Sequence, residues 1–226
     1  MKSLVSLLLV LTLAVPMAYA TGYPEHNPQK ILTVSENASG QKTYGLDMRY
    51  LDRMLGDLSL HAGRYPPSFD SIEQKQRAVQ DLSSLSGMLG LLLKDGKPNP
   101  PILFRSAITN RMGHNLDIPG AAEKAEQQFQ ALLKIEPNAP QGNYQFGIFL
   151  AETGRPERSI PYLEKALALG LEEANYSLAM AYLGLGDKKE ALVRLNKYLK
   201  EKPTDNAAQK LLQAIEEGQD IKIGID

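Results

Sequence analysis

The sequence predicts an all-α fold in which antiparallel helix pairs stack into a solenoid. Apolar residues recur at helical spacing from Leu46 onward, which is typical of amphipathic helices. Gly120, Gly154 and Gly186 follow one another at intervals of 34 and 32 residues. Repeats of that length are typical of stacked helical pairs. A small residue also stands seven positions before each of these glycines, at Gly113, Gly147 and Ala179.

The composition is that of an ordinary soluble globular protein. The chain has 226 residues, of which 43% are apolar and 23% are charged. The formal net charge is −1, so there is no excess of Lys and Arg to neutralise phosphates, and we expect no nucleic-acid partner. The chain has no cysteine, so its stability must come from packing and not from disulfides.

The first twenty residues have the three-part plan of a secretory signal peptide. Lys2 gives a basic start, residues 4–15 form a run of 12 apolar and small residues, and Ala18-Tyr19-Ala20 supplies small residues before the expected cut. A membrane-spanning helix needs about 20 apolar residues, so this run is too short to be an anchor. We therefore expect cleavage after Ala20, no stable membrane insertion of the mature chain, and a periplasmic or secreted location.

Residues 21–45 differ from the rest of the mature chain because they are polar and rich in turn-forming residues. We predict a loosely ordered arm with one short extended piece near residues 31–34. Whether this arm folds back into the groove of the solenoid is left open. Residues 46–95 are predicted to form a divergent helical pair, because Pro66-Pro67 interrupts the helical pattern between its two halves.

The array predicted over residues 102–217 follows from its glycines and prolines. Each glycine permits a positive φ where the first helix of a unit ends. Pro137 and Pro203 each lie 17 residues after one of these glycines and would stop the second helix before the next unit. A single pair cannot bury both its faces, so about three units are needed for a stable core.

The phased residues resemble the motif of the tetratricopeptide repeat (TPR) family over residues 106–205. The matching residues are Phe146, Gly147, Leu150, Gly154 and Ala166, then Ala179, Tyr182, Gly186, Ala191 and Pro203. The resemblance implies a right-handed α-solenoid in which residues 206–217 form a C-terminal capping helix, followed by a tail at 218–226. The second unit is two residues short, with Gly170 where a proline turn is expected, which is also compatible with the related Sel1-like variant.

The same resemblance implies a concave face lined by the first helix of each unit. Its partner-binding groove would comprise Asn110, His114, Tyr144, Ile148, Tyr176, Met180, Leu183 and Lys210. Ile148 and Met180 fit the groove and the core equally well. Tyr144 and Tyr176 favour the groove, because a repeated tyrosine outside the core register is harder to explain by packing. Too few cations stand at these positions to clamp a carboxylate, so we expect a peptide or helix with apolar anchors.

No pattern in the sequence indicates catalysis or a bound cofactor or metal. The three histidines, His26, His61 and His114, lie far apart, and none has a second ligand at helical spacing. We therefore expect a non-catalytic protein–protein interaction scaffold of the bacterial envelope. A self-assembling structural component and an enzyme with an unrecognised site are the alternatives, and the oligomeric state stays open.

Overall fold

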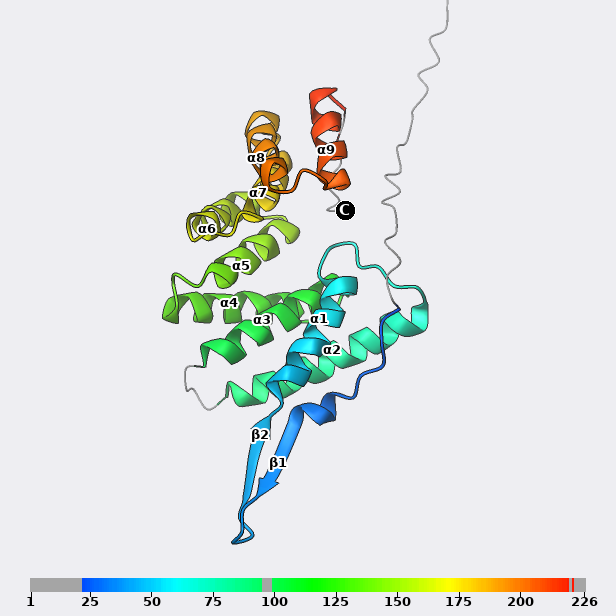
Figure 1. Cartoon of the computed structure of the whole chain (residues 1–226), viewed down its shortest axis with the longest axis vertical. Helices are drawn as coiled ribbons and strands as arrows, with labels where there is room; N and C mark the ends of the chain where they lie inside the picture. The colour runs from blue at the N-terminus through cyan, green and yellow to red at the C-terminus, as the bar shows by residue number, and fades with distance from the viewer. Residues whose placement is uncertain (1–21, 95–98, 220, 222–226) are drawn as a thin grey trace, which may run out of the picture.

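The computed structural model describes residues 22–94, 99–219 and 221 (Figure 1). Its elements in chain order are η1 (Pro28–Ile31), β1 (Leu32–Glu36), β2 (Lys42–Leu46), α1 (Met48–Ala62), α2 (Ile72–Leu92), α3 (Pro100–Asn115), α4 (Ala121–Ile135), α5 (Pro140–Glu152), α6 (Pro156–Ala168), α7 (Ala174–Gly184), α8 (Lys188–Glu201) and α9 (Asn206–Glu216). The signal peptide expected at residues 1–20 lies outside the described residues, as does most of the tail at 218–226.

The predicted solenoid of helix pairs is confirmed. Helices α3 and α4, α5 and α6, and α7 and α8 pack as successive pairs, and α9 follows as a single helix against α8. Figure 1 shows these pairs stacked one upon another along the long axis of the molecule. The array begins at Pro100, two residues earlier than predicted, because the Asn99 side chain accepts a hydrogen bond from the Ile102 N–H and caps α3.

The glycines have the roles that their spacing predicts. Gly120, Gly154 and Gly186 have φ values of 73°, 73° and 76°, in the region that side chains disfavour. At Gly147 a Cβ atom would stand 2.6 Å from Cγ of Leu163, so glycine is what allows α5 and α6 to approach closely. The glycines of the repeat therefore have two roles: some adopt positive φ values at turns, and Gly147 lets two helices pack closely.

The short second unit ends in a glycine turn where the other units have a proline. Gly170 has a φ of 93° just beyond α6, and the Leu171 N–H donates to the Ala166 carbonyl at 3.1 Å. This pattern, with glycine in the left-handed region after the last helical residue, is a recognised way to end a helix. The turn at Gly170 therefore ends α6 and leads into α7 without a proline.

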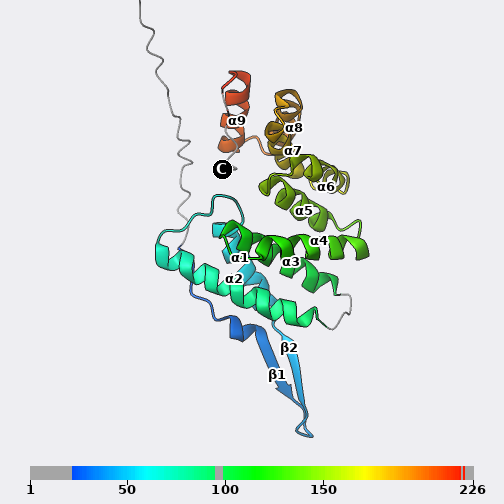
Figure 2. The same cartoon turned by 180° about the vertical axis from the view of Figure 1, so that it is seen from behind.

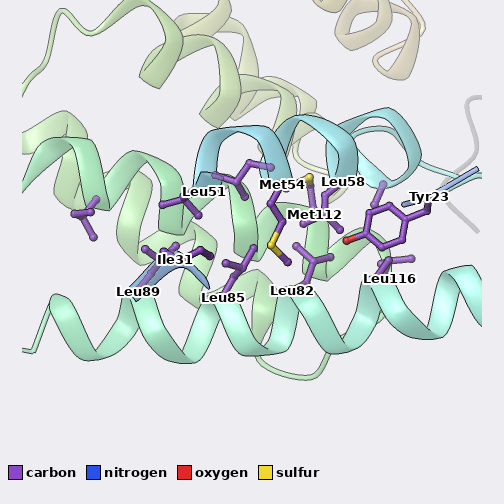
Figure 3. Close-up of a cluster of buried hydrophobic side chains, with 14 residues drawn as sticks. Tyr23, Ile31, Leu51, Met54, Leu58, Leu82, Leu85, Leu89, Met112 and Leu116 are labelled. Carbon is purple, nitrogen blue, oxygen red and sulfur yellow. The ribbon is translucent and has the colours of Figure 1, made fainter. Parts of the chain in front are cut away.

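The N-terminal arm is ordered where the structure describes it, so the prediction of a loosely ordered arm is wrong there. Tyr23 and Ile31 are each only 2% exposed and fill the core between α1 and α2, as Figure 3 shows. The Tyr23 hydroxyl donates to Oδ2 of the buried Asp81 on α2 at 2.7 Å. The arm thus completes a divergent helix pair and lies against α1 and α2, which also differs from an arm folded into the groove of the array.

A two-stranded antiparallel hairpin follows η1 and projects away from the helices (Figure 1). Leu32 pairs with Leu46 and Val34 with Tyr44 across the strands. Asn37 closes the turn, because its side-chain oxygen accepts hydrogen bonds from the backbone N–H groups at residues 39 and 41. This hairpin is an addition to the predicted helical fold.

Candidate functional site

The surface that could hold a partner is formed by α3, α5 and α7 on the side of the α1–α2 loop, residues 63–71. We call it the concave face. Figure 2, seen from behind, shows this loop rising from the α1–α2 pair toward α9. The Gly63 carbonyl at the start of this loop accepts a hydrogen bond from Nη2 of Arg111 on α3, so the base of the loop contacts the repeat array.

Tyr144 and Ile148 lie where the second unit meets the third. Both are partly buried and pack against a cluster that contains Leu163, Leu178 and Ala181. Burial raises the pKa of the Tyr144 hydroxyl, which places the phenol in a partly dry environment. These two side chains thus contribute to packing between units and still keep part of their surface accessible.

Tyr176 and Leu183 occupy the corresponding place in the third unit. They pack with Tyr198 against the cluster that holds α7, α8 and α9 together, and the Tyr176 and Tyr198 rings lie 5.3 Å apart. Burial raises the pKa of Tyr198 to about 12, helped by its hydrogen bond to Asp205 at 2.8 Å. Tyr176 and Tyr198 thus form an aromatic pair, and the Tyr198 hydroxyl is bonded to Asp205.

Asn110 is unavailable to a ligand, so its inclusion in the groove is a mistake. The side chain is 2% exposed and points into the helices. Its amide nitrogen donates to the Ser106 carbonyl and to Gln128, each at 2.9 Å, and its oxygen accepts from the Ser86 hydroxyl at 2.7 Å. These bonds join α2, α3 and α4 and satisfy a buried amide.

The other predicted groove residues are partly or fully accessible. His114 is partly buried and meets the ring of Phe149 edge-on at 6.1 Å. Met180 is partly buried on α7, and Lys210 is exposed on α9. Of the predicted groove residues, five thus lie partly buried on α5 and α7, His114 lies on α3 and Lys210 on α9; the five are Tyr144, Ile148, Tyr176, Met180 and Leu183.

Arg111 is not a free cation, although it stands at a concave position. Its guanidinium Nε lies 2.9 Å from Oε2 of Glu152 and its Nη2 lies 2.7 Å from Oε1. Nη1 donates to Gln145 at 3.0 Å, and Nη2 also donates to the Gly63 carbonyl at 2.7 Å. Four of its five N–H donors are thus used to join α3, α5 and the α1–α2 loop.

Arg64 is a charged residue of the α1–α2 loop that the sequence did not single out. It is exposed on the α1–α2 loop, and its positive charge lowers the pKa of Tyr176 against the larger raising effect of burial. It acts in the same direction on Tyr144, Tyr198 and Asp205. No pattern in the sequence could have placed it there, because its position depends on how the loop docks onto the array.

The described residues contain no group of three or more His, Cys, Asp or Glu side chains arranged to hold a metal ion. A pocket of about 480 Å³ lies open between α4, α5 and α6, and none of the predicted groove residues lines it. Its described lining includes Lys134, Tyr162 and Lys165 but no carboxylate or histidine. None of the described helices is long and apolar enough to cross a bilayer.

The comparison with protein families decides the identity of the repeats. The family model described as tetratricopeptide repeat matches residues 150–215. Residues 150–215 are thus identified as tetratricopeptide repeats. The matched segment runs from the end of α5 into α9 and so covers the third helix pair completely. A search of curated proteins found no match.

Solved structures of TPR proteins share the fold. The crystal structure of MamA is similar with a TM-score of 0.56 and 21% identity, covering 67% of this chain and 86% of that one. A thermophilic TPR protein of Thermus thermophilus gives a TM-score of 0.52 and 17% identity, covering 75% and 92%. YrrB, described as a TPR protein with an unusual peptide-binding site, gives 0.53 and 16%, covering 74% and 85%. The TPR fold supports a role as a protein–protein interaction scaffold.

Proposed function

We propose that this TPR protein is a non-catalytic scaffold of the bacterial envelope that binds a peptide or helix of a partner protein on its concave face. The observation that carries the proposal is the register of Tyr144, Ile148, Tyr176, Met180 and Leu183, all partly buried and partly accessible on α5 and α7. Tyrosine and methionine are enriched at binding surfaces because they offer much contact area.

Three further points support this reading. The face carries no metal-binding group among the described residues, and the described lining of the pocket between α4, α5 and α6 includes no carboxylate or histidine. YrrB, which shares the fold, is described as having a peptide-binding site. The leader-like residues 1–20 support export and hence an envelope partner.

The test is a pull-down from envelope extract with residues 21–226 as bait. The parent chain is compared with Tyr144→Ala/Tyr176→Ala, and Tyr44→Ala on the exposed hairpin serves as the matched control. Circular dichroism melting shows that each variant is folded. We expect a partner that the parent and Tyr44→Ala capture and the double variant loses, and whose purified form binds the parent directly. A folded double variant that retains every partner of the parent contradicts the proposal.

A further inference from the structure

The β1–β2 hairpin has one apolar face and one polar face. Side chains alternate between the two faces along a strand, and residues paired across the strands share a face. The apolar face of the hairpin therefore consists of Leu32, Val34, Tyr44 and Leu46. The opposite face consists of Thr33, Ser35, Thr43 and Gly45. Antiparallel sheets with this alternation commonly have their apolar face packed and their polar face in water.

The outer part of the apolar face is uncovered by the described part of the chain. Tyr44 is 75% exposed, Val34 58% and Leu32 54%. Leu46, at the base of the hairpin, is partly buried and packs against the core between α1 and α2. An isolated two-stranded hairpin is marginally stable in water, and a second layer against its apolar face would stabilise it. A single copy of the chain does not supply that layer within the described residues.

The apolar face ends in one carboxylate and one ammonium group. Glu36 is paired with Lys42 across the strands, two residues beyond Val34 and two before Tyr44. Both charged side chains are exposed and lie on the apolar face, because they share its alternation. Two copies of this face can approach without repulsion between like net charges, since each offers the other a group of opposite sign. The face is therefore complementary to itself in charge and in apolar character.

The turn of the hairpin is polar, which disfavours a lipid bilayer as the occupant. Residues 37–41 contain Ala38 as their only apolar side chain. The Asn37 side chain is exposed and accepts hydrogen bonds from backbone N–H groups of the turn. Burying such groups and the Glu36 and Lys42 charges in hydrocarbon would be costly. The hairpin therefore fits a protein surface better than a membrane.

We propose that the apolar face of the β1–β2 hairpin docks onto the same face of a second copy of the chain. This inference goes beyond the proposed function and does not depend on it. Figure 1 shows the hairpin and α9 at opposite ends of the molecule, so the contact leaves the α7 end of the concave face free in both copies. Each strand has five residues and is about 17 Å long, and such a face buries less than the about 800 Å² per partner of a standard interface. The dimer is therefore weak and its population depends on protein concentration.

Sedimentation velocity of residues 21–226 measures this association at protein concentrations from about 10 μM to 1 mM, the range of a weak complex. We expect the mass of the parent to rise toward that of a dimer as the concentration increases. Tyr44→Ala should weaken the association by about tenfold, because a tyrosine at the centre of an interface contributes strongly. Leu60→Ala is the matched control, since Leu60 is 73% exposed on α1, and it should associate like the parent. Circular dichroism checks that both variants are folded.

Charge exchange tests whether the contact is between two copies of the face. Glu36→Lys gives the face two positive charges and Lys42→Glu gives it two negative charges. Each variant alone should remain monomeric because its copies repel, and an equimolar mixture of the two should associate. Mixing does not restore the pair within either hairpin, so recovery in the mixture reports a contact between chains.

Three results would overturn the proposal. The first is a parent that stays monomeric over the whole concentration range, and the second is association that Tyr44→Ala leaves unchanged. The third is a mixture of the charge variants that associates no better than either variant alone. A monomeric parent that binds vesicles of phosphatidylethanolamine and phosphatidylglycerol, and loses this binding with Tyr44→Ala, would assign the face to lipid instead. Capture of a partner by the concave face should persist in Tyr44→Ala, so the two surfaces are tested separately.

Discussion

Arg111 and Glu152 form a two-pronged ion pair between neighbouring repeats, with bonds of 2.9 and 2.7 Å. The two side chains are 6% and 16% exposed, so the pair is largely shielded from water. Because the same guanidinium holds the Gly63 carbonyl, one pair fixes two repeats and the α1–α2 loop at once. The position of the α1–α2 loop relative to the array therefore depends on this pair.

Glu152→Ala should therefore destabilise the fold strongly. Removing one partner leaves the Arg111 charge buried without compensation, which costs about 3 kcal/mol or more. The exposed pair between Asp52 and Arg105, at 2.6 Å, supplies the control, and Asp52→Ala should cost about 1 kcal/mol or less. Urea denaturation measures both. Equal costs for the two variants would mean that the Arg111–Glu152 pair has no special structural role.

Gly147→Ala should destabilise the second repeat. The new Cβ would meet Cγ of Leu163 at 2.6 Å, and the backbone nitrogen of Leu163 at 3.3 Å leaves little room for relaxation. Forcing α5 and α6 apart costs about 1–3 kcal/mol. Gly90→Ala on α2 has open space around it and should instead stabilise by about 0.5–1 kcal/mol. A neutral Gly147→Ala in thermal melts would contradict the close approach.

Tyr23→Phe should lower stability most at neutral pH. Burial raises the pKa of Asp81, and the hydrogen bond from Tyr23 opposes that rise. A raised folded-state pKa means that the contribution of Asp81 falls as pH climbs from the ordinary aspartate pKa through the raised one. Loss of the hydroxyl raises that pKa further, so the variant should lose about 1.5–3 kcal/mol when Asp81 is ionised. The loss should shrink in acid, where Asp81 is protonated in both states.

Urea denaturation of Tyr23→Phe at neutral and mildly acidic pH checks this dependence. Tyr44→Phe is the matched control, because Tyr44 is 75% exposed on the hairpin and should be neutral at both pH values. The same loss for Tyr23→Phe at both pH values would show that the bond does not involve an ionised Asp81.

Export should depend on the first twenty residues. Fusion of residues 1–20 to an alkaline phosphatase that is active only outside the cytoplasm should give activity, and mass spectrometry of the released chain should find Thr21 as its first residue. Lengthening the apolar run should convert the leader into an anchor as it approaches about 20 residues. An inactive fusion would show that residues 1–20 do not direct export, and the proposed location in the envelope would then be wrong.

The sequence predicted the array well because its signals are local and repeated. Gly120, Gly154 and Gly186 have positive φ values at turns within single units. The close contact that requires glycine at position 147 is with Leu163 of the same unit. These constraints are read directly from spacing. The capping helix α9 was found in the same way, because it continues the period.

The arm and the site could be predicted less well because they depend on contacts distant in sequence. The residues around Tyr23 are polar, so the sequence gives no sign that this tyrosine is buried. It is buried because α1 and α2 leave space for its ring between them. The hairpin did have a local signal, since Leu32, Val34 and Tyr44 alternate with polar residues around the turn at Asn37. Asn110 has the register of a groove residue, but the docking of α2 buries it.

Photo-crosslinking from the concave face tests the central claim most directly. A photoreactive amino acid replaces Met180 on α7 in the full-length chain expressed in cells, and Tyr44 on the hairpin in a matched control. If the concave face binds a partner protein, irradiation should yield a defined crosslinked species from position 180 that the Tyr144→Ala/Tyr176→Ala background abolishes, and none of that species from position 44. The same species from both positions, or its persistence in the double variant, would contradict partner binding on the concave face.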